Sequence, residues 1–296
     1  MLLTVFDPWK SKLCTCPDKL TFNPYTGCDH GCLYCYASSY IPRFHECRTK
    51  KNILPRLTNE AIKLKGELIS ISNSSDPYPR LEQEICLTRN CLKILSKNFC
   101  RLQIVTKSDL VTRDIDILQT VPCLVSITIL TTDDKLSGKL EPGAPESSRR
   151  LKAIEVLVAA GIPTTVRIDP VIPFLNDDLT DLMEIIADLG TRHVTCSSYK
   201  IKPDNWKRFI AVFPKVAKKL KPLYFSTGER IGRSTYLPKD LRYGLMKKAK
   251  ELAQKNNLTF GCCREGFQLN SGICDGSWVI QKHKFDQRGN LDLGSK

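Results

Sequence analysis

The chain has 296 residues, of which 42% are hydrophobic and 26% are charged. This composition supports a folded core and excludes intrinsic disorder, and the length fits one large α/β domain or two small ones. The formal net charge of +14 favours a polyanionic partner such as nucleic acid, although ordinary solvated lysine-rich helix faces give the same excess. The basic residues gather at residues 48–51, 215–221, 247–250 and 282–284.

The first residues and the cysteine content predict the compartment. Residues 1–8 are too short for a signal peptide, and no apolar run is long enough to span a bilayer, so we expect a cytoplasmic protein with no membrane contact. Fourteen cysteines in such a chain indicate metal ligation or plain burial instead of disulfides. A reducing, oxygen-poor environment follows from that interpretation.

Short apolar or β-branched runs alternate with helical patterns along the chain, which predicts repeated βα units around a parallel sheet. After an N-terminal segment of residues 1–17, strands are expected at residues 20–26, 67–72, 102–106, 124–131, 164–172 and 193–199. Helices are expected at residues 59–65, 88–96, 114–119, 147–160 and 179–189. A strand-like run at 223–227 and a helical pattern at 241–256 are expected to cover the open side of the sheet.

Three cysteines follow the first expected strand in the order Cys28-Asp-His-Gly-Cys32-Leu-Tyr-Cys35. An ordinary 4Fe-4S cluster takes four thiolates, so a loop that supplies three leaves one iron open to a ligand. Gly27 and Gly31 permit the left-handed backbone that a tight wrap needs. A zinc knuckle and buried cysteines without metal are the alternatives, but zinc sites usually present two separated pairs of ligands.

Polar side chains also stand after the second and third expected strands and on the fourth and fifth. They stand at residues 72–79, 106–108, 126–128 and 167–170. In parallel βα architectures the loops at the carboxyl ends of the strands converge on one mouth, where functional groups gather. We therefore expect these residues to surround the cysteine loop.

The spacing C-x3-C-x2-C, with an aromatic residue before the last cysteine, resembles the signature of the radical S-adenosylmethionine (SAM) superfamily. The resemblance implies a 4Fe-4S cluster held by Cys28, Cys32 and Cys35, with its open iron binding SAM and its electron cleaving SAM to a 5'-deoxyadenosyl radical. It also implies that Tyr34 lies against the adenine. The implied fold is α/β, a partial (β/α)6 barrel over residues 18–222, with a C-terminal extension at 223–296 that covers the barrel.

Five further blocks resemble, within this superfamily, the group typified by the DNA repair enzyme spore photoproduct lyase. They are residues 75–78, 87–89, 106–108, 140–145 and 166–170. The resemblance implies that Ser75 and Asp76 receive the SAM amino group and that Lys107 and Arg167 neutralise its carboxylate. Ser126 or Thr128 would hold the ribose. Taken singly, these residues also fit a capped turn, a surface lysine and ordinary strand packing.

The remaining cysteines fall into two sets. Those in apolar helix or strand contexts are expected to be buried small hydrophobes, namely Cys86, Cys91, Cys100, Cys123 and Cys196. Cys262, Cys263 and Cys274 instead lie in a glycine-rich segment. With Cys14 or Cys16 they are candidates for a second iron-sulfur cluster or a zinc site, or one thiol donates a hydrogen atom to a substrate radical.

Spore photoproduct lyase uses a catalytic cysteine, for which Cys47, Cys263 and Cys274 are the candidates here, although no block fixes the match. The sequence thus predicts a radical SAM enzyme that acts on nucleic acid, by DNA lesion repair or RNA base modification, with flavodoxin or ferredoxin as its electron donor. One alternative is a radical SAM enzyme that acts on a peptide or small metabolite. Another is a metal-stabilised nucleic-acid-binding protein without catalysis.

Overall fold

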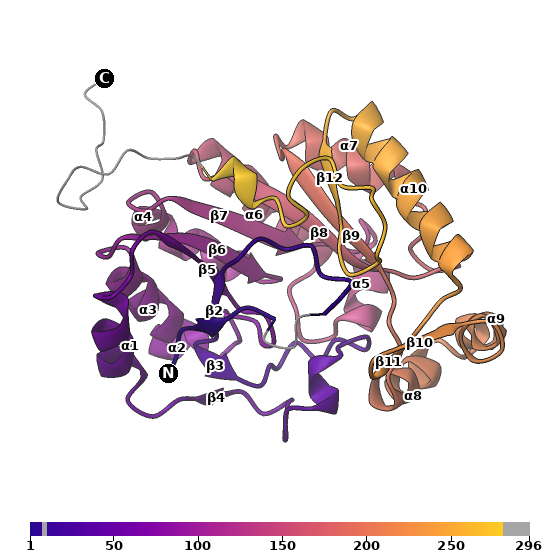
Figure 1. The fold of residues 1–296 in the computed structure, drawn as a ribbon, viewed down its shortest axis with the longest axis horizontal. Coiled ribbons are helices and arrows are strands. Elements are labelled where there is room, and N and C mark those ends of the chain that lie inside the picture. The colour runs from indigo at the N-terminus through magenta and orange to yellow at the C-terminus, as the bar shows by residue number, and fades with distance from the viewer. Residues whose placement is uncertain (8–10, 281–296) are drawn as a thin grey trace.

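The computed structural model describes residues 1–7 and 11–280 and is built on an eight-stranded sheet of order β1-β2-β5-β6-β7-β8-β9-β12 (Figure 1). Its strands are β1 (Thr4–Val5), β2 (Leu20–Phe22), β5 (Glu67–Ile71), β6 (Cys100–Thr106), β7 (Cys123–Thr128), β8 (Thr164–Val171), β9 (His193–Ser198) and β12 (Thr259–Cys262). Only β1 pairs in the antiparallel sense, so the other strands form a parallel sheet with all their carboxyl ends at one edge.

Helices connect the parallel strands. They are α1 (Ile53–Ala61), α2 (Glu82–Ile85), α3 (Leu87–Leu95), α4 (Ile115–Leu118), α5 (Asp134–Leu140), α6 (Ser147–Ala159), α7 (Thr180–Asp188), α8 (Pro203–Val212), α9 (Pro214–Phe225) and α10 (Lys239–Lys255), with 3-10 turns η1 (Ala37–Ser39), η2 (Asp109–Asp114) and η3 (Ser277–Val279). Two small antiparallel pairs complete the fold, β3 (Tyr25–Thr26) with β4 (Arg48–Thr49) and β10 (Glu229–Ile231) with β11 (Ser234–Tyr236). In the described part of the chain, no helix combines the length and the apolar character that crossing a membrane requires.

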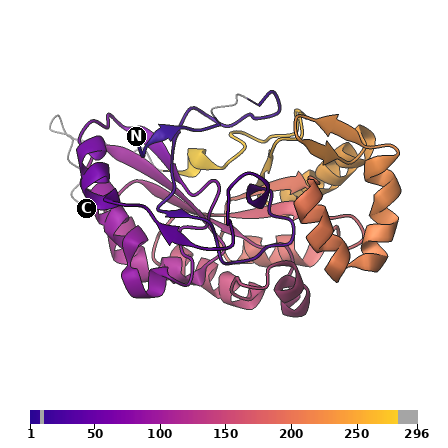
Figure 2. The same cartoon turned by 90° about the horizontal axis from the view of Figure 1, so that it is seen from below.

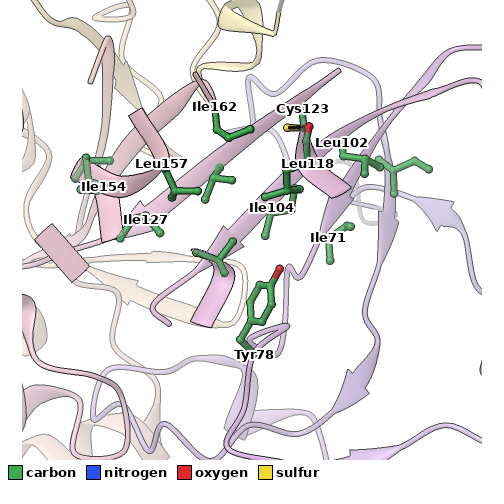
Figure 3. Packing of buried hydrophobic residues seen from close by; sticks show 14 of the residues in the cluster. Ile71, Tyr78, Leu102, Ile104, Leu118, Cys123, Ile127, Ile154, Leu157 and Ile162 are labelled. Carbon is green, nitrogen blue, oxygen red and sulfur yellow. Dashed lines mark hydrogen bonds between the residues drawn. The ribbon is translucent and has the colours of Figure 1, made fainter. Parts of the chain in front are cut away.

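The main hydrophobic core lies between the sheet and the helices on its outer face. Alternate strand residues such as Leu102, Ile104 and Ile127 are buried there in one cluster with Ile154 and Leu157 of α6, and Ile127 lies nearest to that helix (Figure 3). The period-2 alternation of a strand turns the intervening residues to the opposite, concave face. Many of those residues are polar, such as Gln103, Ser126 and Thr165, while Leu68 and Leu124 pack there against Val279 and Ile280.

Chain segments from both ends lie on this concave face, opposite the layer of outer helices (Figure 2). Lys19, just before β2, pairs with Asp275 at 2.5 Å, and both side chains are 3% exposed. The side-chain amide of Gln103 donates to the Asp275 carbonyl at 3.0 Å, and the Thr195 hydroxyl donates to the Cys274 carbonyl at 3.0 Å. The segment after β12 is therefore fixed to polar groups of the sheet.

The expected α/β partial barrel is confirmed, and its six expected parallel strands are present. The expected strand at 20–26 is interrupted after Phe22 and continues as β3, which belongs to a different sheet. The sheet also has a seventh parallel strand, β12, which pairs with β9 beyond the expected core boundary at residue 222. Residues 282–284, one of the four basic groups, lie outside the described residues.

Two expected elements are wrong. Residues 223–225 end helix α9, because Leu220 and Tyr224 share one helix face and are buried in a second core cluster beside the cysteine loop. The expected helix at 59–65 begins earlier, at Ile53, and ends at Ala61. Pro55 does not prevent this start, because an amide in the first helical turn has no intrahelical partner to lose.

Candidate functional site

The cysteine loop at residues 28–35 is held by backbone hydrogen bonds from two sides. The Cys28 amide donates to the Phe44 carbonyl at 2.7 Å, and the Leu33 amide donates to the Leu140 carbonyl at 2.9 Å. Gly27 has φ +81°, and a Cβ there would lie 2.4 Å from the Glu46 carbonyl oxygen. Only glycine fits this position, so the loop enters its turn in one conformation.

Helix α8 supports the same loop from a third side. The Asn205 side chain donates to the Tyr34 carbonyl at 3.1 Å, and the Arg208 guanidinium donates to the Cys35 carbonyl at 3.1 Å. The sequence interpretation missed this helix and both residues. Its start was detectable, because Pro203 stands at the first helical position with Asp204 behind it, a common helix-start pattern.

The three thiols fit a cubane cluster better than a single metal ion. Cys28 and Cys32 are each 8% exposed, and Cys35 is half-buried. Each thiolate of a cubane binds a different iron, so its sulfurs need not converge on one point. Within residues 1–7 and 11–280, no group of three or more His, Cys, Asp and Glu side chains is arranged to hold a metal ion. Three cysteines on one loop are the number of protein ligands that a cubane with one open iron requires.

Positive charge reduces the cost of ionising two of these buried thiols, Cys32 and Cys35. Burial raises the pKa of Cys32 to about 12, and the nearby Lys107 ammonium opposes that rise. Burial also raises the pKa of Cys35, against which the charges of Lys107 and Arg208 act. A metal cluster needs its cysteines as thiolates, so these cations favour the form that binds it.

A buried polar network lies directly behind the loop. The Tyr34 hydroxyl donates to the Glu141 carboxylate, which also accepts from the Arg150 guanidinium at 2.5 Å. Burial opposes ionisation of Glu141, but the charges of Arg150 and Lys107 outweigh it and hold the pKa of Glu141 below its usual value. The Lys107 ammonium also lies 5.6 Å from the centroid of the Tyr34 ring. Tyr34 is thus anchored through its hydroxyl.

Asp76 joins the ends of two neighbouring strands. Its carboxylate accepts from the Thr106 hydroxyl at 2.7 Å and from the Lys107 amide at 2.8 Å. The His30 ring, on the cysteine loop, lies 3.5 Å from the same carboxylate. The Ser75 hydroxyl donates to the Tyr25 carbonyl at 2.9 Å. Asp76 is therefore placed beside the loop, as the sequence predicted.

Arg167 and Asp169 form an ion pair of 2.7 Å where β8 ends. Burial alone would raise the pKa of Asp169, but the charges of Arg167 and Lys200 lower it to about 2. Ser126 and Thr128 are buried on β7, and the Thr165 hydroxyl donates to Ser126 at 3.0 Å. The polar residues expected at successive strand ends thus occur on one side of the sheet.

Four of the expected buried cysteines, Cys91, Cys100, Cys123 and Cys196, lie in the main core, whereas Cys86 is only half-buried between α2 and α3. Cys47 packs at the edge of that core, where burial raises its pKa to about 12.

The cysteines of the glycine-rich segment separate. Cys262 lies in the main core, whereas the Cys274 and Cys16 sulfurs are 3.6 Å apart. The hydrogen bond from Cys16 holds the pKa of Cys274 below its usual value. Cys14 lies near Cys16, and Cys263 lies near the Arg167 guanidinium. The structure thus brings thiols from both ends of the chain together and leaves Cys262 out.

Comparisons with known proteins cover most of the chain. The chain is 34% identical over 177 residues to an uncharacterised protein of Methanocaldococcus jannaschii, which covers 57% of this chain and 65% of that relative. It is 28% identical over 265 residues to an uncharacterised protein of Mycobacterium tuberculosis, covering 82% and 76%. It is 23% identical over 269 residues to a radical SAM Nα-GlyT isomerase of Pseudomonas phage M6, covering 86% and 56%.

Solved structures share the fold. Spore photoproduct lyase with bound AdoMet and dinucleoside spore photoproduct superposes with a TM-score of 0.62 at 16% identity, over 86% of this chain and 77% of that one. SuiB of Streptococcus suis bound to S-adenosylmethionine superposes with a TM-score of 0.55 at 16% identity, over 85% and 52%. The model of the radical SAM superfamily matches residues 22–189, more than half of the chain. The chain therefore belongs to the radical SAM superfamily and is a radical SAM enzyme.

Proposed function

We propose that this enzyme binds a 4Fe-4S cluster through Cys28, Cys32 and Cys35 and cleaves SAM reductively. Membership of the superfamily implies both cofactors. The observation that carries the ligand assignment is the clamped three-thiol loop with the Lys107 ammonium beside it. When bound, the cluster supplies one electron, which splits SAM into methionine and a 5'-deoxyadenosyl radical that abstracts a hydrogen atom from the substrate.

The residues around the loop have distinct proposed roles. Asp76, with Ser75, receives the SAM amino group, since carboxylate and hydroxyl oxygens accept from an ammonium. Lys107 and Arg167 neutralise the SAM carboxylate by charge-assisted hydrogen bonds. Ser126 or Thr128 holds the ribose, and the ring of Tyr34 lies against the adenine. Glu141, which holds the Tyr34 hydroxyl, acts as a positioning residue for that ring.

The proposed substrate is nucleic acid, by DNA lesion repair or RNA base modification. The net charge of +14 supports this class, and so does the likeness in fold to an enzyme solved with a dinucleoside spore photoproduct. A peptide or small metabolite is the alternative substrate class. The chain belongs to an enzyme superfamily, so the alternative of a metal-stabilised nucleic-acid-binding protein without catalysis is rejected.

The same proposal names the protein that reduces the cluster and the thiol that donates a hydrogen atom to the substrate radical. A flavodoxin or ferredoxin supplies the electron in a reducing cytoplasm, in keeping with fourteen free thiols. Cys263 is the best placed of the three candidate donors, because it lies near Arg167 where the sheet ends, whereas Cys47 packs at the core edge. The alternative role for these thiols is a second cluster or zinc. Of the expected ligands Cys262 lies in the main core, which leaves Cys263 and Cys274 with Cys14 or Cys16, although these thiols are not arranged to hold a single metal ion.

The test is anaerobic reconstitution with iron and sulfide, reduction with dithionite, addition of SAM and detection of 5'-deoxyadenosine by mass spectrometry. We expect about four irons per chain and 5'-deoxyadenosine from the native protein, and neither from Cys32→Ala. Cys86→Ala is the matched control, because Cys86 lies between α2 and α3, away from the loop, and should keep both. A fully loaded cluster that yields no 5'-deoxyadenosine with or without added DNA or RNA would reject the proposal. Iron or zinc beyond the first cluster that disappears in Cys16→Ser would identify the second site.

A further inference from the structure

Two exposed tyrosines stand immediately beside the cysteine loop. Tyr36 follows Cys35 directly, and Tyr40 ends the short η1 turn. Their side chains are 47% and 53% exposed, whereas Tyr25, Tyr78, Tyr199 and Tyr224 are each 1% exposed. The two rings are stacked, with centroids 6.3 Å apart and planes at 28°. Large aromatic surface left open at such a position indicates a binding site.

The pair is fixed in place. The Tyr36 hydroxyl donates to the Asn73 carbonyl at 3.1 Å, which holds its ring from the edge and leaves a face free. On the adjacent Ser38, the hydroxyl donates to the Asp204 carboxylate at 2.6 Å, which ties η1 to helix α8. A stacking surface needs this kind of support, because a mobile ring loses entropy when a ligand orders it.

Two cations lie beside the pair, and a third lies near one of them. The Lys202 ammonium lies 5.7 Å from the centroid of the Tyr40 ring. The charge of Arg264, which follows β12, acts on both tyrosine hydroxyls. Arg233, in the turn between β10 and β11, lies close enough to act on Lys202.

The nearby carboxylates already have partners. Asp204 binds Arg208 at 3.1 Å and Asp169 binds Arg167 at 2.7 Å. Asp7 lies 3.0 Å from Arg264 and partly neutralises its positive charge. Lys202 and Arg233 take part in no ion pair among the described residues. The rim of the tyrosine pair is therefore positive and suits an anion.

The location connects the pair to the reaction. Tyr36 follows Cys35 directly and Tyr40 ends the next turn, so the rings adjoin the cluster loop. A group bound on them lies at the same mouth as the proposed SAM residues. The pair is thus on the substrate side of the proposed site.

We propose that Tyr36 and Tyr40 form a stacking platform for one unpaired base of a DNA strand, with Lys202, Arg233 and Arg264 holding the flanking phosphates. Every base has a π face that stacks on an aromatic ring, and a positive rim follows the phosphate backbone. An enzyme that reacts with a base must take it out of the duplex, so an open ring surface beside the reactive group is the expected receiver. This inference rests on the proposed function and names its binding element.

The experiment measures fluorescence anisotropy of a labelled single-stranded DNA with the reconstituted enzyme and SAM under anaerobic conditions. Tyr40→Ala should weaken binding roughly 5- to 160-fold, because base stacking on an aromatic side chain contributes about 1–3 kcal/mol. Tyr40→Phe keeps the ring and should bind within about twofold of the native enzyme. Tyr243→Ala is the matched control, since Tyr243 is 45% exposed on α10 and packs edge-on against Phe267. It should bind normally.

A second variant tests the positive rim independently of the rings. Lys202→Gln removes one proposed phosphate contact. The slope of log affinity against log salt concentration should therefore become shallower by the amount expected for about one contact. It also keeps the proposal testable if Tyr40→Ala fails to fold. Native binding by both Tyr40→Ala and Lys202→Gln would overturn the platform, and tighter binding of RNA of the same sequence would overturn the assignment to DNA.

The readouts separate this inference from the function on which it rests. Normal 5'-deoxyadenosine formation without any oligonucleotide binding would reject the platform and the nucleic-acid substrate while leaving SAM cleavage intact. A reconstituted native enzyme that binds DNA but forms no 5'-deoxyadenosine would reject the radical chemistry and leave the proposed platform unaffected. Competition by an acidic peptide as strong as that by DNA would also overturn the base assignment.

Discussion

At the residue scale, the local sequence specifies the cysteine loop but does not reveal the residues that support it. Cys28, Cys32 and Cys35 could be identified because their spacing lies within one short segment. Glu141 and Arg150 could not be identified as a network, because their burial arises only when α5 and α6 pack behind the loop. Glu141 stands before Pro142 and Gly143 in a sequence that reads as an ordinary turn.

The Glu141 and Arg150 pair has a measurable effect on stability. The two side chains are 1% and 0% exposed, so Glu141→Gln leaves a buried guanidinium without its counter-charge. We expect the free energy of unfolding of the metal-free protein to fall by about 3–5 kcal/mol, measured by urea denaturation. Glu155→Gln on α6 breaks an exposed pair with Lys152 and should change it by about 0.5 kcal/mol or less. Equal effects of the two changes would contradict this account.

At the scale of elements, the βα alternation could be predicted because periodic burial is written into each segment. Strand β12 could not be, since its four residues include Gly261 and Cys262 and carry little pattern of their own. It is specified by pairing with β9, which a local sequence does not show. Helix α9 was misassigned for a related reason, because the aromatic run at 223–225 fits a strand until the second core cluster buries one side of it.

Replacement of two glycines by alanine should have opposite effects on stability. A Cβ on Gly261 would lie 2.0 Å from the Cys274 carbonyl oxygen, so Gly261→Ala should destabilise by about 1–3 kcal/mol. Gly244 lies inside α10 with nothing within 4 Å of its ideal Cβ, so Gly244→Ala should stabilise by about 0.5–1 kcal/mol. Thermal unfolding of both variants measures this, and a Gly261→Ala protein as stable as the native one would refute the contact.

His193 connects β9, β12 and the C-terminal segment, through hydrogen-bonding distances of 2.9 Å to Thr259 and 3.2 Å to the Cys274 carbonyl. Burial lowers the pKa of His193 to about 4, whereas an imidazole in an unfolded chain titrates near ~6.5. Folding therefore favours the neutral ring, and the stability this confers is complete above about pH 6.5 and is lost as the pH falls towards 4.

We expect this residue to lower the free energy of unfolding of the metal-free protein by about 2 kcal/mol between pH ~7 and pH ~5. Urea denaturation at both pH values, with His193→Gln alongside, measures the contribution. The variant should lose less stability on acidification than the native protein. The same loss in both would attribute the pH dependence to other groups.

At the scale of the whole molecule, the net charge of +14 and the resemblance to a DNA repair enzyme were the signals for the partner. The general class of partner could be predicted because charge is a property of composition. The tyrosine platform could not, because Tyr36, Lys202 and Arg264 are brought together from distant parts of the chain. Recognition of a base by the tyrosines therefore depends on tertiary structure, whereas the general attraction of a polyanion depends mainly on composition.

DNA binding by the whole enzyme should weaken steeply with salt. Three phosphate contacts on single-stranded DNA give a slope of about −2 in log affinity against log salt, which is roughly a 20-fold loss between ~50 and ~200 mM. Anisotropy titrations at several salt concentrations measure this slope. An affinity that does not change with salt would mean that the positive charge serves another purpose.

The pair between Lys19 and Asp275 joins residues 256 positions apart and has a consequence for how the enzyme matures. A ribosome makes the chain from its amino end, so the cysteine loop emerges long before the segment after β12 that lies on the concave face. Contacts of such large sequence separation form late, because closing a long loop costs more entropy. The concave face of the sheet is thus open in the growing chain and is covered only after the segment that carries Asp275 has been made.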